Sequence, residues 1–416
     1  MFFSFCLQVT FAQKTTIVSL EIVGQDKIKT SYLKKIITTK QGEVLDSVKL
    51  NQDITFLKRL PAVSHAYFKV DRLSSSKSHV KIGIEENFTL LPSLNFWTTT
   101  NKQFAYKLGL YEYNFLGNNT TFGGFYQNNG FHSYGFTYRA PNLFSKKWGL
   151  AISFKDWKSE EPLYFGEKTA NYLYNNTSVE LLGLYQLNLK HRIDFGISFF
   201  SEKYKYLSGE TAAGVPLALD LDKKLLKLVY QYNGLDYYYQ YVSGFKSVLY
   251  TQYVTTQNDF QNDFLIAWND FFYYKRIGAK GNWANKLRLG IASNENSPFA
   301  PFALDNNVNI RGVGILVDRG TGVAVLNSEY RHTVYDKKWL AIQTNIFTDA
   351  GTWREPGGQL SDLFKKEKLR VFSGIGLRFI SKKIYNATFR IDYGFKVYDA
   401  RNTTKGGLVF GLGQYF

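Results

Sequence analysis

Two stretches near the C-terminal third, AVLNSEYRH and LAIQTNIFTDAG, each place a carboxylate on one face, together with the residues two positions before and after it. These residues are Asn327, Glu329 and Arg331 in the first stretch and Phe347, Asp349 and Gly351 in the second. Because side chains alternate between the two faces of a β-strand, Glu329 and Asp349 point to the face that Leu326, Tyr330 and Ile346 avoid. Two carboxylates held close together away from bulk water require a cation. The chemistry indicated is therefore charge-assisted hydrogen bonding.

The stretch NVNIRGVGIL supplies a candidate cation, Arg311, followed by Gly312. A planar guanidinium can bridge two carboxylates, and a glycine lets the backbone turn tightly beside it. We predict that the loop carrying Arg311 folds inward, so that Arg311 reaches Glu329 and Asp349. The alternative is that Arg311 is a solvated loop residue and that the two acids line a water-filled pore.

Catalytic and metal-binding patterns are not evident. The histidines are isolated, and neither a nucleophile elbow nor a phosphate loop is present. The one cysteine, Cys6, leaves the rest of the chain without disulfides or thiolate metal sites. We expect a protein that is not an enzyme and has no cofactor or metal, although a hydrolase assembled from distant strands stays open. The five histidines are His65, His79, His132, His191 and His332.

The elements that would position these residues are long alternating strands. In TFRIDYGFKV, residues 388–397, aromatic and aliphatic side chains share one face while Arg390, Asp392 and Lys396 share the other. One face suits lipid and the other suits water. Within a bilayer an open sheet edge would leave amides without partners, so such a sheet must close into a barrel.

Composition agrees with a barrel in a membrane. Aromatic residues make up 17% of the chain, with 30 Tyr and 35 Phe, as girdles at both membrane interfaces require. Mean hydropathy is −0.25, and alternating strands do not raise it. We predict an all-β, 16-stranded antiparallel transmembrane β-barrel over residues 90–416. The sixteen predicted strands are 94–99, 103–113, 120–127, 132–139, 148–157, 178–187, 192–202, 225–237, 245–254, 262–274, 283–292, 324–334, 338–349, 370–379, 387–397 and 407–415.

The first ninety residues follow a different pattern. Residues 1–13 end in Thr10-Phe11-Ala12 and are typical of the end of a secretory signal peptide, possibly truncated because no Lys or Arg precedes Lys14. Residues 15–88 predict the order β-α-α-β-β, an N-terminal α+β domain. We expect Thr30 or Ser31 to cap the first helix. The predicted apolar face of the second helix consists of Val48, Leu50, Ile54, Leu57 and Leu60.

This element order, with the stretch GEVLD and the closing IEE, resembles a polypeptide-transport-associated (POTRA) domain. The resemblance implies a periplasmic domain that handles client polypeptides by adding an extended client chain to a free sheet edge. A generic small α+β domain is the alternative.

A POTRA-like domain, Ile310-Arg311-Gly312 in a long loop and the two alternating motifs together resemble the outer-membrane superfamily of barrel-assembly insertases and two-partner-secretion transporters, the bacterial surface antigen type of barrel. The resemblance implies that Arg311 is held inside the barrel by Asp349, with Glu329 as a second acceptor and Gly351, Asn327, Arg331 and Phe347 beside them. It extends to YEYNFLGNN around Asn114 to Gly117, and to Asp236 and Gly244. Val313 departs from the Tyr or Phe that is usual in the loop motif.

Glycines in the last predicted strand indicate a weak seam where the barrel closes. Glycine in a strand costs entropy and packs nothing, and the first strand is predicted to start after Pro92. We predict a lateral seam between these two strands. The residues that mark it are Pro92, Gly406, Gly407, Gly411 and Gly413. The terminal aromatic Phe416 resembles the C-terminal signal for insertion of outer-membrane barrels.

These features predict an outer-membrane factor that inserts or exports client polypeptides through a laterally opening barrel, with its N-terminal domain in the periplasm. The alternatives are a two-partner-type transporter for one exported protein, or a passive porin. The expected partners are unfolded outer-membrane or secreted clients, the lipid bilayer, lipopolysaccharide and possible accessory lipoproteins. Nucleic acid is not expected, because the net charge of +17 is scattered along the chain without a basic run.

Overall fold

A computed structural model describes residues 15–98, 104–165, 168–256, 262–294, 299–303, 309–314, 319–399, 405–413 and 416. The predicted signal peptide, residues 1–13, lies outside the described residues. Among the described residues, no helix is both long and apolar enough to cross a membrane.

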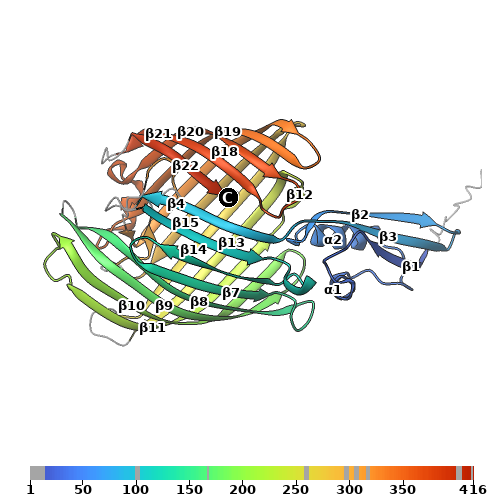
Figure 1. Cartoon of the computed structure of the whole chain (residues 1–416), viewed down its shortest axis with the longest axis horizontal. Coiled ribbons are helices and arrows are strands. Elements are labelled where there is room, and N and C mark those ends of the chain that lie inside the picture. The colour runs from blue at the N-terminus through green and yellow to red at the C-terminus, as the bar shows by residue number, and fades with distance from the viewer. Residues whose placement is uncertain are drawn as a thin grey trace, which may run out of the picture.

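The chain begins with a small α+β unit at one end of the molecule (Figure 1). Its central strand is β3, which pairs in parallel with β1 and antiparallel with β2. Both helices pack on this sheet through a shared apolar core that includes Leu33, Leu50 and Ile82. The elements of this unit are β1 (Thr16–Val23), α1 (Thr30–Ile36), α2 (Ser47–Leu57), β2 (Val63–Arg72) and β3 (Lys77–Glu86).

Two details of the helices differ from the sequence prediction. Val48 is 67% exposed, whereas the other residues of the predicted apolar face are buried. Val48 is the second residue of α2 and lies two positions before Leu50. It is therefore off the apolar face, which residues at helical spacing from Leu50 form. The predicted caps Thr30 and Ser31 lie within α1 instead of before it. Only α2 has a side-chain cap, in which Asp46 accepts hydrogen bonds from the Val48 and Lys49 amides.

All the remaining strands except β16 and β17 form one closed barrel, and the predicted 16-stranded antiparallel β-barrel is confirmed. The short strand β12 continues the position of β11, since both pair with β13. The barrel closes where β22 lies next to β4. Its strands are β4 (Leu90–Thr98), β5 (Phe104–Glu112), β6 (Thr121–Asn128), β7 (His132–Ala140), β8 (Trp148–Phe165), β9 (Lys168–Gln186), β10 (His191–Gly209), β11 (Ala218–Asn233), β12 (Asp236–Tyr238), β13 (Tyr241–Thr256), β14 (Phe264–Ile277), β15 (Gly281–Ala292), β18 (Gly322–Asp336), β19 (Leu340–Arg354), β20 (Arg370–Ser381), β21 (Thr388–Asp399) and β22 (Gly406–Leu412).

The strands β8 to β11 are longer than predicted, with 18, 19, 19 and 16 residues. A strand needs about ten residues to cross a bilayer, and the sequence analysis gave each of these strands about that length. The extra residues continue the same ladder, since Lys203 of β10 still pairs with Asp220 of β11. These four strands therefore form a sheet that extends past the thickness of a membrane.

Alternation along the strands separates an apolar exterior from a polar interior. On β21 the outward Phe389, Tyr393 and Phe395 are exposed, while the inward Asp392 is fully buried. On β11 the outward Leu226 and Leu228 are likewise exposed. The outer surface at these residues therefore suits hydrocarbon.

The small unit contacts the barrel through short turns, at the end where it lies in Figure 1. Arg59, which follows α2, donates to the carbonyl oxygens of Leu189 and Leu235 at 2.5 and 2.9 Å. Tyr32 of α1 donates to Asn142 Oδ1 at 2.9 Å. We call this end of the barrel the domain end.

Candidate functional site

The described part of the long connection between β15 and β18 folds inside the barrel. It includes the short strands β16 (Phe302–Ala303) and β17 (Arg319–Gly320), which pair with each other, and residues 309–314. Ile310 and Val313 are buried in an apolar cluster with Trp353 and Phe372 of the barrel wall. Val313 thus fills space in this cluster although it is smaller than the aromatic residue expected at its position.

Arg311 is fully buried and faces two carboxylates. Its Nε and Nη2 donate to Asp349 Oδ2 and Oδ1 at 2.8 and 3.0 Å, a bidentate arrangement, and its main-chain N–H donates to Oδ2 at 3.0 Å. Its Nη1 donates to Glu329 Oε2 at 2.6 Å. The two acids come from neighbouring strands, β18 and β19, where Asn327 pairs with Asp349 and Glu329 pairs with Phe347.

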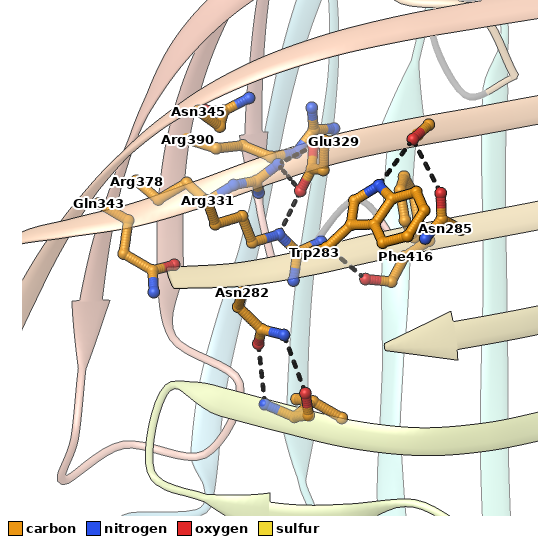
Figure 2. Close-up of polar contacts among 12 residues, drawn as sticks. Asn282, Trp283, Asn285, Glu329, Arg331, Gln343, Asn345, Arg378, Arg390 and Phe416 are labelled. Carbon is orange, nitrogen blue, oxygen red and sulfur yellow. Dashed lines mark hydrogen bonds and ion pairs between the residues drawn. The ribbon is translucent and has the colours of Figure 1, made fainter. Parts of the chain in front are cut away.

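Glu329 also binds two arginines of the barrel wall (Figure 2). Arg378 Nη2, from β20, lies 2.7 and 2.6 Å from the two oxygens of Glu329. Arg331 Nε donates to Glu329 Oε1 from the same strand. Glu329 therefore accepts from three guanidinium groups, which offset the cost of burying its charge.

A third acid, Asp392 of β21, extends the cluster. Arg311 Nη1 lies 3.7 Å from Asp392 Oδ1. Arg390 and Asn345 donate to the two oxygens of Asp392 at 2.9 and 3.2 Å. Sequence reasoning did not place Arg378, Asp392 or Asn345 in the site. The strand parity that placed Glu329 inside would also have placed Asp392 and Arg378 there.

Two predicted neighbours support the loop by contact. The guanidinium carbon of Arg311 lies 3.6 Å from the centre of the Phe347 ring, a cation–π contact. Asn327 Nδ2 donates to the main-chain oxygen of Asn309 in the loop at 2.8 Å. Gly351 lies two residues beyond Asp349 on the same face of β19. It pairs with Val325 of β18 and Arg370 of β20.

The loop backbone touches β21 through two glycines. Gly312 has φ of +88°, and a Cβ on it would lie 2.6 Å from the carbonyl oxygen of Gly394. A Cβ on Gly394 would in turn lie 2.3 Å from the carbonyl oxygen of Arg311. Only glycine at both positions allows this approach. We call Arg311, Gly312, Glu329, Asp349 and Gly351 the loop latch.

The chemistry of this site is binding. Arginines cannot act as general bases, and the carboxylates are saturated by guanidinium and amide donors. Within the described ranges, no group of three or more His, Cys, Asp or Glu side chains could hold a metal ion. The arrangement can hold a loop inside the barrel beside β21, which is one strand away from the closing pair β22 and β4.

The predicted seam residues lie in this closing pair. Pro92 lies inside β4, opposite Leu110 of β5, whereas the sequence prediction had β4 start after it. Proline removes one ladder donor and is confined to edge strands and strand starts. The strand β22 has only seven residues, so its ladder with β4 is short.

The glycines of β22 leave the strand without side chains at these positions. They also allow neighbouring atoms to approach its backbone closely. A Cβ on Gly406 would lie 2.3 Å from the Gly394 carbonyl oxygen, and one on Gly411 would lie 2.5 Å from Arg390 Nε. Gly407 is nearest to the loop, with the Gly312 carbonyl oxygen 3.7 Å from its Cβ position. Gly413 has φ of +90° just beyond the strand.

Phe416 lies apart from the end of β22 at Leu412, and residues 414–415 lie outside the described residues. Its ring packs with Leu235, Tyr274 and Ala284 inside the domain end. Arg331 Nη2 donates to its main-chain oxygen at 3.2 Å (Figure 2).

The remaining motif residues lie in turns at the domain end, away from the loop latch. Asn114 is buried and accepts from the Asn119 amide at 2.9 Å, and the Gly117 carbonyl accepts from the Lys29 amide at 3.0 Å. Asp236 starts β12, opposite Ser243, next to Gly244 with φ of +107°.

No protein-family model matches the sequence, and no curated protein matches it significantly. Solved structures do match. BamA from Haemophilus ducreyi lacking POTRA domains 1–3 aligns with a TM-score of 0.58 at 14% identity, over 96% of this chain and 84% of that chain. CdiB from Acinetobacter baumannii aligns with 0.59 at 14% over 96% and 73%, and CdiB from Escherichia coli with 0.63 at 11% over 96% and 75%. The resemblance to this superfamily is thus confirmed at the level of the fold.

Proposed function

We propose that this protein is an outer-membrane factor that inserts or exports client polypeptides through lateral opening of its barrel. The observation that carries the proposal is the buried loop latch beside the closing strands, in a barrel with the fold of BamA and CdiB. The loop contacts Gly394 of β21. Because β21 is the strand that pairs with β22, holding or releasing the loop changes how firmly β21 is held in place.

The seam between β22 and β4 is the proposed site of opening. Both strands are short, and one carries a proline while the other carries several glycines. The main-chain groups exposed by separation need partners in lipid. An extended client strand supplies them by pairing with the freed edge. The free energy comes from closing the client strands in the bilayer, so no covalent step or nucleotide is required.

The small N-terminal unit is proposed to be a POTRA-like domain in the periplasm. Its order β-α-α-β-β supports this, as does its place at the end with short turns, which in outer-membrane barrels faces the periplasm. In the sheet order β1-β3-β2 the outer strands are β1 and β2. An edge of this sheet can pair with an extended client before the client reaches the barrel.

A transporter for one secreted protein is the second candidate. It is favoured by hydrated charge pairs on the inner wall opposite the latch, such as Lys227 with Glu180. Depletion of the protein followed by outer-membrane proteomics separates the candidates. Loss of many barrel proteins supports insertion, whereas loss of a single exported protein supports secretion.

Cross-linking the seam tests lateral opening directly. Cysteine pairs introduced across 90–94 of β4 and 408–412 of β22 should block activity when oxidised and restore it after reduction. The matched control is a cysteine pair at Asn269 and Leu289, which face each other across β14 and β15, far from the seam in strand order. Unchanged client assembly or secretion with a fully oxidised seam would contradict the proposal.

A further inference from the structure

A cavity of about 520 Å³ lies where the N-terminal unit meets the domain end of the barrel. Its wall is formed by the segment after α2, the β12–β13 turn, β14, β18 and the turn between β20 and β21. This volume is within the range of ligand-binding cavities. Any ligand in it touches both the small unit and the barrel.

The charge of this cavity is one-sided. Five of the described residues that line it are Lys or Arg, and none is Asp or Glu. Arg331 and Lys382 are already paired, with Glu329 and Asp336. Lys58, Arg59 and Lys246 form no ion pair with a described carboxylate. Asp236 acts on Arg59 only through space. The cavity therefore attracts an anionic ligand.

Among the described residues, two polar atoms of the wall have no hydrogen-bond partner. Gln240 is 5% exposed, and its Oε1 accepts no hydrogen bond although its Nε2 donates to Asp336. Arg59 Nε is buried without an acceptor, while its two other nitrogens donate to carbonyl oxygens. The cavity thus offers one acceptor and one donor, which are what the N–H and C=O of a peptide backbone satisfy. A phosphodiester group has no hydrogen-bond donor and would leave the Gln240 oxygen unpaired.

Aromatic side chains complete the lining. Phe272 lies under Lys246, with the ammonium nitrogen 5.2 Å from the ring centre, and Tyr274 and Tyr385 line the same space. Phe416 already occupies one corner, with its ring in the Tyr274 cluster and its main-chain oxygen on Arg331. This corner demonstrates that an aromatic residue and a backbone oxygen fit the site together.

From these observations, we propose that the cavity binds an acidic polypeptide segment that carries aromatic side chains, as the receiving site between the N-terminal unit and the barrel. Its carboxylates pair with Lys58 and Lys246, its backbone with Gln240 and Arg59, and its rings with the aromatic lining. The inference rests on the proposed function for its biological role, because it names the client segment that is received.

The test is binding of labelled peptides to the full chain in lipid nanodiscs, followed by fluorescence anisotropy. The probe is a peptide of alternating Asp and Phe. The comparison peptide has Lys in place of Asp, and inorganic phosphate serves as a competitor. Saturable binding of the acidic peptide that phosphate at equal concentration does not displace is expected. Equal binding of the basic peptide, or complete displacement by phosphate, overturns the proposal.

Variants locate the site. Lys246→Gln combined with Lys58→Gln should weaken the acidic peptide about tenfold, because charged hydrogen bonds are lost. Lys34→Gln, on the exposed face of α1, is the matched control and should change binding less than about twofold. Lys246→Glu should shift the preference toward the basic peptide. An equal loss in Lys34→Gln, or an unchanged preference in Lys246→Glu, overturns the site.

Failure of this test and failure of the proposed function are distinguishable. Peptide binding is measured without any client assembly, whereas seam locking and depletion are measured in cells. If the locked seam stops activity but the acidic peptide does not bind, only the receiving site is wrong. If the peptide binds and depletion affects no client, the cavity stands and the proposed function falls.

Discussion

The two sides of the barrel interior use the same ion-pair chemistry in opposite surroundings. On the side of β18 to β21, Arg311, Glu329 and Asp349 are 0% exposed. On the opposite side, Lys227 of β11 and Glu180 of β9 are 20% and 21% exposed.

Surroundings decide what each pair contributes. A buried charge without its partner is costly, so breaking a buried pair destabilises by about 3–5 kcal/mol. An exposed pair is screened by water and is worth roughly 0.2–1 kcal/mol. Counting ion pairs would rate the two sides alike. Burial instead identifies the loop latch as the element whose loss changes the protein, and Lys227–Glu180 as a pair that solvent reaches.

The largest expected effect is that of Arg311→Ala. Removing the guanidinium leaves Asp349 buried without its main donor and removes one of three arginines from Glu329. We expect the anchoring of the loop to lose about 3–5 kcal/mol, while the barrel itself stays folded on its strand ladders. The measurement is modification of a cysteine placed at Val313, which is buried when the loop is seated.

The matched control for this release is Arg139→Ala, which removes an arginine of β7 paired with Asp194 of β10, where Arg139 is 28% exposed. Its effect on Val313 labelling should be absent. Slow labelling in Arg311→Ala, at the wild-type rate, would mean that the loop is held by its apolar contacts alone.

A smaller effect is expected from Gly312→Ala. The new Cβ would lie 2.6 Å from the Gly394 carbonyl oxygen, at a φ of +88°. Strain at positive φ costs about 1–3 kcal/mol, and here the overlap with β21 adds to it. Gly314→Ala is the control, because Gly314 has the same φ and no described atom lies within 4 Å of its Cβ position. Faster Val313 labelling in Gly312→Ala than in Gly314→Ala is expected. Equal rates would show that only backbone strain matters.

The latch side also shows what the sequence could predict. Strand parity needs only the period of two, and each predicted strand corresponds to a strand of the barrel. The same parity places Glu329 and Asp349 inside. Which loop residue meets them is a matter of tertiary packing. Guanidinium chemistry made Arg311 the candidate, and the motif resemblance supplied its pairing with Asp349.

Strand parity alone could not predict which inward side chains from different strands meet. Arg378 and Asp392 join Arg311 from β20 and β21, and no local pattern says that these strands curve around one loop. The glycines of β22 were interpreted as bare positions, but Gly406 and Gly411 make room for Gly394 and Arg390. Such clearances depend on neighbours that the local sequence does not reveal.

The opposite wall gives the third prediction. Lys227→Ala removes the partner of Glu180, which keeps a hydrogen bond from Ser198 at 2.9 Å. Because water reaches this pair, we expect the unfolding free energy to fall by less than about 1 kcal/mol. Urea titration of the unfolding transition in nanodiscs measures it. A loss as large as that of Arg311→Ala on loop anchoring would abolish the distinction between the two walls.

The smallest expected effect belongs to the contact between the N-terminal unit and the barrel, which is aromatic and titratable. His65 of β2 stacks on Tyr239, with ring centres 5.4 Å apart and 13° between the planes. Burial lowers the pKa of His65 below its ordinary value of about 6.5, and Lys58 lowers it further while Glu85 opposes both.

We expect contact with the barrel to supply part of this burial, so that undocking returns the pKa of His65 toward its ordinary value; docking is then fully favoured above about pH 6.5 and weakens as pH falls below it. We expect a fluorescence distance between the unit and the barrel to lengthen reversibly from pH 7 to pH 5. His65→Phe keeps the ring and removes the titration, so its distance should stay constant over this range. The latch pairs carry no histidine, so Val313 labelling should not follow the same pH curve. If it does, the two ends of the barrel are coupled. The latch and its surroundings would then behave as one cooperative unit, and the contrast between them would not hold.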